Sequence, residues 1–179
     1  MKFETKCLHA GYSPKNGEPR VQPIVQSTTY TYDSAEEIGK LFDLQAAGYF
    51  YTRLANPTTN AAEEKITALE GGVATMCTAS GQSAVFYAML NILEAGDHFI
   101  SSSYVYGGSY NLFAHTFKKM GIEVTFVDQD LPLEELKKAI RPNTKAVFAE
   151  TIANPALRVL DIEKFAALAK AAEAPLLVD

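Results

Sequence analysis

The sequence predicts an α/β fold: a mostly parallel sheet with helices on both faces, preceded by an extended N-terminal arm. The main observation is a regular alternation of amphipathic helical segments and short apolar segments from residue 58 onwards. Short apolar strands separated by helices are typical of parallel sheets that are covered on both faces. The expected helices are 58–70, 82–93, 108–120, 132–140 and 161–172, and the expected strands are 73–77, 98–102, 123–127, 145–150 and 175–178.

Residues 1–35 are expected to form the irregular, extended arm. The segment 21–30 is β-branched and polar without a helical period, and prolines interrupt strand pairing. A short helix is expected over 36–46, an extended aromatic segment over 48–53, and a turn at Asn56-Pro57. The chain therefore divides into an arm or interface segment, 1–55, and part of a sheet domain, 56–179.

The helices of the second part carry signals at their ends. Gly71 is the expected C-terminal glycine of the helix over 58–70, Pro132 fits a first helical turn, and Asp161 is a plausible cap. The expected core face of the helix over 58–70 consists of Ala62, Ile66 and Leu69.

Composition excludes several classes of function. The formal net charge of −5 is spread over interspersed acids and bases, which argues against nucleic acid or a membrane surface as partner. No apolar run reaches the roughly 18–20 residues of a membrane span, and the N-terminus lacks the apolar core of a signal peptide, so we expect a cytoplasmic protein. Two cysteines suit neither a disulfide scaffold nor a zinc site. Because the chain stops inside an expected strand, we expect it to be the N-terminal portion of a longer enzyme.

The segment 78–84 is a candidate phosphate-binding turn. It follows the expected strand 73–77 and opens the helix over 82–93 with Ser80, Gly81 and Gln82. Small residues at such a turn let backbone N–H groups approach a phosphate at the positive end of the helix. A capping serine followed by glycine is equally consistent with an ordinary helix start, so both interpretations stay open.

The carboxyl ends of the other strands carry Tyr106, Asn154 and Asp179. Ligands of parallel sheets bind at this edge. A phosphate-binding turn, an aromatic ring, an amide and a carboxylate could together hold a flat, phosphorylated ring that contains nitrogen. A dinucleotide site is disfavoured because the turn has one glycine rather than the Gly-x-Gly-x-x-Gly pattern, and no Walker A motif is present.

Several short motifs follow one another along the chain. They are His9-Ala10-Gly11-Tyr12, Tyr51-Thr52-Arg53 with Asn56-Pro57-Thr58, Ser80-Gly81-Gln82, Ser101-Ser102-Ser103 with Tyr106-Gly107-Gly108, and Glu150-Thr151 with Asn154-Pro155. In these motifs and their order the whole chain resembles the Cys/Met-metabolism family of fold-type I enzymes that depend on pyridoxal phosphate (PLP). Within that family the segments 80–82, 106–113 and 150–157 resemble the O-acetylhomoserine sulfhydrylases most.

The resemblance implies roles for five residues of the expected sheet domain. Gly81 and Gln82 would donate backbone N–H groups to the PLP phosphate, and Tyr106 would stack on the ring and assist proton transfer as a catalytic residue. A buried Asp179 would pair with the protonated pyridine nitrogen. Asn154 would hydrogen-bond near the ring hydroxyl or the substrate carboxylate. Each has a structural alternative: a helix cap, a core aromatic, a strand-end acid or a turn residue.

Tyr51 and Arg53 resemble a pair that reaches the PLP phosphate of a neighbouring subunit, which implies a homo-oligomer, expected to be a tetramer. In the family, a lysine beyond the position of Asp179 forms the Schiff base with PLP. No lysine of this chain lies in a matching motif. The resemblance therefore implies that residues 56–179 are the N-terminal part of a PLP-binding large domain, and that the chain alone is inactive.

For the intact enzyme the resemblance implies γ-replacement of acetate in O-acetyl-L-homoserine by sulfide or a thiol, which gives homocysteine or a homologue. One alternative is a cystathionine γ-synthase, or a methionine or cystathionine γ-lyase, of the same family. The other is a non-catalytic fragment that shares the fold.

Overall fold

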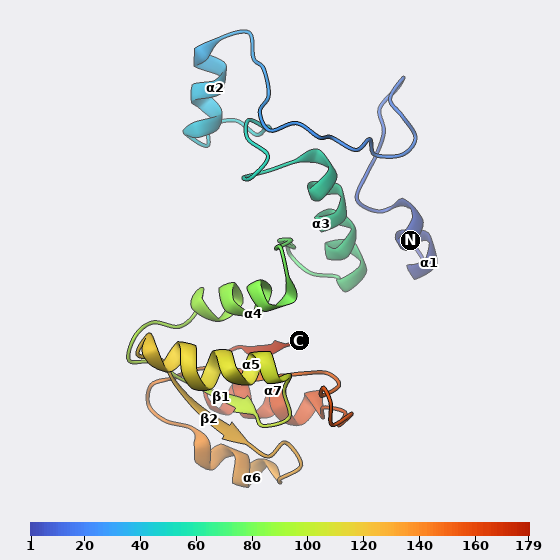
Figure 1. Ribbon diagram of the computed structural model, residues 1–179. Coiled ribbons are helices and arrows are strands. Elements are labelled where there is room, and N and C mark those ends of the chain that lie inside the picture. The colour runs from blue at the N-terminus through green and yellow to red at the C-terminus, as the bar shows by residue number, and fades with distance from the viewer. The chain divides into compact units, whose positions relative to one another are not determined.

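The computed structural model describes residues 1–179, which form two compact units, Met1–Cys77 and Thr78–Asp179. The first unit contains the helices α1 (Phe3–His9), α2 (Ala35–Phe42) and α3 (Pro57–Glu70), joined by irregular segments (Figure 1). The predicted arm, residues 1–55, lies within this unit together with α3. None of the helices combines the length and the apolar character that a membrane crossing requires.

The second unit is built on a four-stranded parallel sheet. Its strands are β1 (His98–Ser102), β2 (Glu123–Val127), β3 (Thr144–Ala149) and β4 (Leu176–Val178), in the order β2-β1-β3-β4. These four strands confirm the predicted ones, and β1 and β2 have the predicted ends. Because every strand runs in the same direction, their carboxyl ends share one edge of the sheet.

Helices cover both faces of this sheet, as predicted (Figure 1). On one face lie α4 (Gly81–Leu90) and α5 (Gly107–Asn111), the latter continued by the π-helical segment η1 (Leu112–Phe117). On the other face lie α6 (Leu133–Leu136), followed by the 3₁₀ turn η2 (Lys137–Ala139), and α7 (Ile162–Ala171). The side chain of Asp161 caps α7 by accepting a hydrogen bond from the Lys164 N–H at 3.0 Å, as expected.

Strand residues alternate between two buried cores because successive side chains point to opposite faces. Phe99 and Phe148 pack under α4 and η1, whereas Ile100 and Val147 pack against α6 and α7. The first core is aromatic: the Phe113 ring lies 5.0 Å from the Phe99 ring and 4.9 Å from the Phe148 ring, both edge to face. A sheet that is covered on both sides explains why all residues of β1 are buried, its two serines included.

Three expectations about local structure are wrong. Residues 73–77 are not a strand, and Val73 and Met76 are strongly exposed. A strand needs a partner, and no strand of the chain pairs with this segment. The arm is not extended throughout, because Phe3–His9 is helical. Finally, the expected core face of α3 is not buried: Ile66 is 46% exposed, and no α3 residue is fully buried.

Asn56 organises the first unit. Its Oδ1 accepts a hydrogen bond from the Thr58 N–H at 2.8 Å and so caps α3, where Pro57 takes the first helical position. Its Nδ2 donates to the Val25 carbonyl at 3.0 Å and to the Thr52 Oγ1 at 3.1 Å. Asn56 thus ties the arm and the loop around Thr52 to the start of α3, and the predicted turn at Asn56-Pro57 is where the helix begins.

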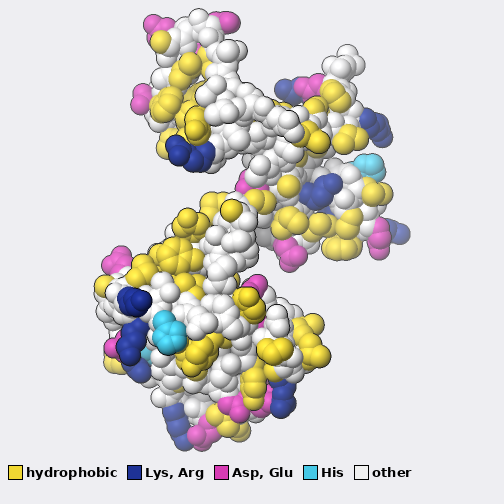
Figure 2. Space-filling view, viewed as in Figure 1, with side chains coloured by type: hydrophobic (Ala, Val, Ile, Leu, Met, Phe, Trp, Pro, Cys, Tyr) yellow, Lys and Arg dark blue, Asp and Glu magenta, His cyan; other side chains and the backbone are white.

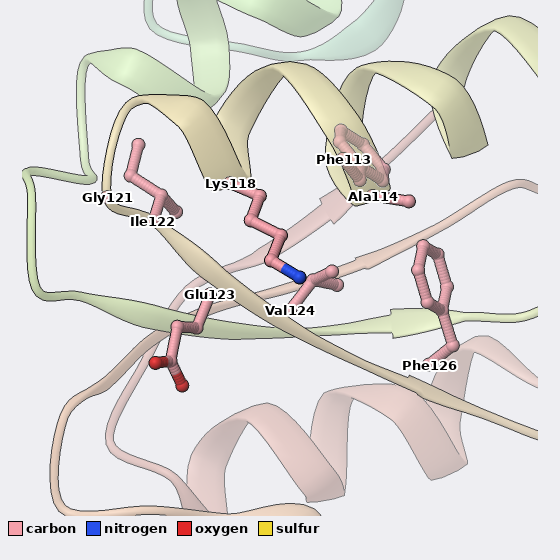
Figure 3. Close-up of a pocket in the computed structure, with 8 residues that line it drawn as sticks. All are labelled: Phe113, Ala114, Lys118, Gly121, Ile122, Glu123, Val124 and Phe126. Atoms are coloured by element: carbon pink, nitrogen blue, oxygen red, sulfur yellow. The ribbon is translucent and has the colours of Figure 1, made fainter.

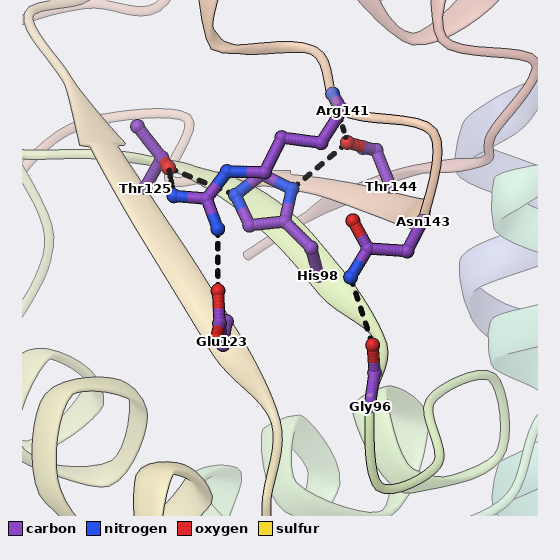
Figure 4. Close-up of polar contacts among 7 residues, drawn as sticks. All are labelled: Gly96, His98, Glu123, Thr125, Arg141, Asn143 and Thr144. Carbon is purple, nitrogen blue, oxygen red and sulfur yellow. Dashed lines mark hydrogen bonds and ion pairs between the residues drawn. The ribbon is translucent and has the colours of Figure 1, made fainter.

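The amino ends of the strands carry a polar network around the buried His98 (Figure 4). His98 is fully buried, and its two ring nitrogens each lie 2.8 Å from a threonine hydroxyl, Nδ1 from Thr144 and Nε2 from Thr125. Arg141 donates to Glu123 and to Thr125 beside the ring. Burial lowers the pKa of His98 to about 4, Arg141 acts in the same direction, and Glu123 opposes them.

This histidine is expected to make the unit sensitive to acid. In the unfolded chain its pKa is about 6.5, so the unfolded state binds a proton first, and stability is lost as the pH falls from about 6.5 to about 4. The loss attributable to His98 is about 3 kcal/mol. Urea unfolding between pH 8 and pH 4 measures this loss of unfolding free energy. The variant His98→Gln has no group at position 98 that titrates in this range, so the difference between the two proteins separates the contribution of His98 from that of the carboxylates. Equal pH slopes for both proteins would contradict this account.

Candidate functional site

The carboxyl edge of the sheet brings together the predicted residues of the second unit. Tyr106 follows β1, Asn154 follows β3, and Asp179 follows β4. The loops that carry them are joined by hydrogen bonds and close contacts, described below. Gly81 and Gln82 lie at the start of α4 next to these loops. The prediction that these positions gather at one edge is therefore supported for the second unit.

The start of α4 is capped by Ser80. The Ser80 Oγ accepts a hydrogen bond from the Ser83 N–H at 3.1 Å, and its carbonyl accepts one from the Ala84 N–H at 3.0 Å. The N–H groups of Gly81 and Gln82 donate to no other group of the chain. The helix-cap and the phosphate interpretations are therefore compatible. Ser80 accepts hydrogen bonds from the N–H groups of Ser83 and Ala84, and the N–H groups of Gly81 and Gln82 stay free.

The start of α4 has room for a phosphate group. A side chain built at Gly81 would meet nothing within 4 Å, and both Gly81 and Gln82 are exposed. Free N–H groups and the positive end of the helix favour an anion at this position. The residues present therefore fit the phosphate group of a cofactor.

Tyr106 is held against Gly108 at the start of α5. A Cβ atom at position 108 would overlap the Tyr106 Cε1 atom and would lie 3.3 Å from the Gln82 Oε1 atom. The absence of a side chain at Gly108 thus leaves room for the Tyr106 ring, and the Gln82 side chain lies beside the same position. Tyr106 is 52% exposed, so it is not the core aromatic of the alternative interpretation, and the residue is accessible from solvent.

Glu150, for which the sequence suggested a structural rather than a catalytic role, lies among the predicted site residues. It is 5% exposed, and its Oε1 accepts a hydrogen bond from the Tyr106 N–H at 2.6 Å. Its Oε2 accepts a longer one, 3.4 Å, from the Asn154 N–H. One buried carboxylate thus joins the loop after β1 to the loop after β3. The sequence feature that could have indicated this role is the position of Glu150 directly after β3, a buried strand.

The loop after β3 is joined in turn to Asp179. The Thr151 N–H donates to the Asp179 carbonyl at 2.7 Å, and the Asp179 N–H donates to the Ala149 carbonyl at 3.0 Å. These bonds continue the ladder between β3 and β4 by one residue. These bonds fix the backbone of Asp179, and its side chain is exposed in this structure. A buried Asp179 carboxylate stays a prediction.

Tyr51 and Arg53 lie in the first unit and form a pair there. The Arg53 guanidinium lies 5.1 Å from the centre of the Tyr51 ring, a cation–π distance. Tyr51 bridges to Thr29, and the Thr52 N–H between them donates to the Thr28 carbonyl at 2.9 Å. Arg53 forms no ion pair with a carboxylate of the chain. The loop is thus anchored, and its cation is available to an anion.

A separate hollow lies beside the edge strand β2 (Figure 3). Its volume is about 550 Å³, and it lies between η1 and β2. None of the residues that line it belongs to the candidate site. They are Phe113, Ala114, Lys118, Gly121, Ile122, Glu123, Val124 and Phe126.

The carboxyl edge of this parallel sheet presents an open helix start, an accessible aromatic ring and a carboxylate. This arrangement is typical of an α/β enzyme domain that binds a phosphorylated cofactor. The comparison with known families gives the particular class. Residues 4–179 match the family described as Cys/Met metabolism PLP-dependent enzymes, and the chain belongs to this family. The family assignment made from the sequence motifs is thereby confirmed, and its cofactor is pyridoxal 5'-phosphate.

Individual relatives agree with this assignment. The chain is 48% identical to an O-acetyl-L-homoserine sulfhydrylase of Leptospira meyeri, over 100% of this chain and 40% of the relative. It is 44% identical to an L-methionine gamma-lyase of Fusobacterium nucleatum subsp. polymorphum, over 92% of this chain and 42% of the relative. Thus the chain spans about 40% of the length of these curated relatives.

A solved structure shows the same fold. It is a putative O-acetylhomoserine (thiol)-lyase from Campylobacter jejuni that contains an N'-pyridoxyl-lysine-5'-monophosphate. It is 36% identical to this chain and superposes with a TM-score of 0.92, over 100% of this chain and 44% of that one. The predicted fold class is therefore confirmed.

Proposed function

We propose that this protein acts as a PLP-dependent sulfhydrylase that replaces the acetate of O-acetyl-L-homoserine with sulfide or a thiol, giving homocysteine or a homologue. The observation that carries the proposal is the gathering of Gln82, Tyr106, Asn154 and Asp179 at one edge of the sheet in a chain of this family. The 48% identity to a named O-acetyl-L-homoserine sulfhydrylase supports this substrate. A γ-lyase remains the second candidate, because a named γ-lyase is 44% identical.

In this proposal residues 56–179 contribute to the PLP-binding domain, and its residues bind opposite ends of the cofactor. The free N–H groups of Gly81 and Gln82 hold the phosphate, the Tyr106 ring stacks on the pyridine, and the Asp179 carboxylate pairs with the ring nitrogen. Asn154 donates from its amide to the ring hydroxyl or the substrate carboxylate. When bound, PLP supplies an electron sink for negative charge that develops on the substrate. The Tyr106 hydroxyl holds or moves a proton near the leaving group.

We also propose that the protein is a cytoplasmic homotetramer in which Tyr51 and Arg53 serve the site of a neighbouring subunit. The guanidinium of Arg53 has no carboxylate partner in its own chain, and its planar fork suits phosphate. Exposed apolar side chains also call for a partner surface. They gather over α4 in Figure 2, where Tyr87 is 55% exposed.

The test uses the protein made from its full coding sequence. The expected results are visible absorbance from bound PLP and release of acetate from O-acetyl-L-homoserine that depends on sulfide. Release of ammonia and a keto acid without sulfide would favour the γ-lyase. Residues 1–179 alone are expected to release no acetate. Absence of bound PLP in the full protein would contradict the proposal.

Gly108→Ala is expected to weaken PLP binding without unfolding the protein. The new Cβ displaces the Tyr106 ring, and the stacking that is lost is worth about 0.5–1.5 kcal/mol, or up to about tenfold in Kd. A spectroscopic titration with PLP measures the change. Gly107→Ala is the matched control, because a Cβ there would meet nothing within 4 Å. Equal PLP affinity of the two variants would argue against the role of Gly108.

A further inference from the structure

Glu150 makes an unusual set of contacts for a buried carboxylate. No lysine, arginine or histidine forms an ion pair with it, and both of its oxygens accept hydrogen bonds from backbone N–H groups. A buried carboxylate is costly unless it accepts hydrogen bonds, so losing either of these two bonds is unfavourable. The donors belong to Tyr106 and Asn154, which lie 44 residues and 4 residues away in sequence.

The bond to Tyr106 also completes the start of a helix. Tyr106 is the N-terminal cap residue of α5, and its own side chain makes no capping hydrogen bond. Instead, Glu150 brings a negative charge to this N-terminus from the end of β3, where the helix dipole favours it. The 2.6 Å bond fixes the backbone from which the Tyr106 ring projects.

We propose that Glu150 is a positioning residue that holds Tyr106 and Asn154 in one fixed arrangement for cofactor binding; this inference rests on the proposed function. Glu150 acts through the two backbones and does not touch the cofactor itself. Its carboxylate is needed because both of its oxygens must accept. In Glu150→Gln the amide nitrogen would face an N–H group, so one of the two bonds is lost and its donor is left unpaired.

The test is a PLP titration of the full-length protein and its Glu150→Gln variant, with the visible circular dichroism of bound PLP as a second readout. We expect a Kd at least about tenfold higher and a weaker dichroic band, because the Tyr106 ring is no longer held. The matched control is Thr144→Val, which removes buried hydrogen bonds at the opposite edge of the sheet. Thr144→Val should lower the melting temperature and leave the PLP affinity unchanged.

A double-mutant cycle separates positioning from general destabilisation. In a Tyr106→Ala background, Glu150→Gln should have a clearly smaller effect on the Kd for PLP than in the wild type. Full additivity, or an unchanged Kd with only a lower melting temperature, would overturn the inference. A wild-type protein that binds no PLP would overturn the proposed function and this inference with it, so the two failures are distinct.

Two further measurements keep the test decisive if Glu150→Gln does not fold. Glu150→Asp keeps the charge but shortens its reach, and it should show the same rise in Kd. Hydrogen exchange on the wild-type protein requires no variant: the peptide containing the Tyr106 amide should be protected before PLP is added. An unprotected amide there would overturn the inference.

Discussion

Phe113→Ala is expected to lower the free energy of unfolding by about 3–5 kcal/mol, a large share of the stability of a domain of this size. Phe113 is fully buried, and its ring contacts Phe99, Phe117 and Phe148. These rings join β1, β3 and η1, so the cavity left by the substitution lies where three elements meet. Urea unfolding followed by circular dichroism measures the loss.

Tyr110→Ala is the control from the same helical stretch. Tyr110 is 43% exposed and stacks only on Phe126, so its removal should cost about 1 kcal/mol. If Phe113→Ala cost no more than Tyr110→Ala, the aromatic cluster would not be the centre of this core.

Gly11→Ala is expected to detach α1 from α3. Gly11 has a φ of 87°, which disfavours alanine, and its Cβ would overlap the Ala61 carbonyl oxygen and lie 2.9 Å from the Lys65 Cβ. Strain and overlap together exceed about 3 kcal/mol. A helix of the length of α1 is not stable alone, so it should fray once detached. Hydrogen exchange of the amides in residues 3–10 should accelerate strongly.

Gly17→Ala separates the two causes. Gly17 has a similar φ of 83°, but a Cβ there would meet nothing within 4 Å. This variant should show only the backbone strain, about 1–2 kcal/mol, and leave the exchange in α1 unchanged. Protection of α1 that survives in Gly11→Ala would show that the close approach to Ala61 is relieved in another way.

The sequence alone allowed much of the second unit to be predicted, because its elements are defined by local pattern. The apolar runs at β1 and β2 end at polar residues, and their predicted bounds are correct. Tyr106 and Asp179 could be placed at one edge because they follow parallel strands. The helix α1 was missed, although Glu4 in its first turn and His9 in its last complement the helix dipole and could have indicated it.

The remaining differences concern partners that local pattern does not reveal. Residues 73–77 have the composition of a strand, but a strand forms only by pairing with another segment. The α3 face was predicted from spacing alone, and spacing does not say whether a surface exists to cover it. The role of Glu150 depends on loops that only the folded chain brings together.

The unpaired segment 73–77 has a consequence for the behaviour of residues 1–179 in concentrated solution. It is a short uncharged stretch with most of its amide and carbonyl groups free, flanked by glycine on one side. Such stretches are templates for intermolecular β-pairing and amyloid-like association. Concentrated solutions of residues 1–179 are therefore expected to precipitate, and a charge placed at Ala74 should delay the onset of turbidity.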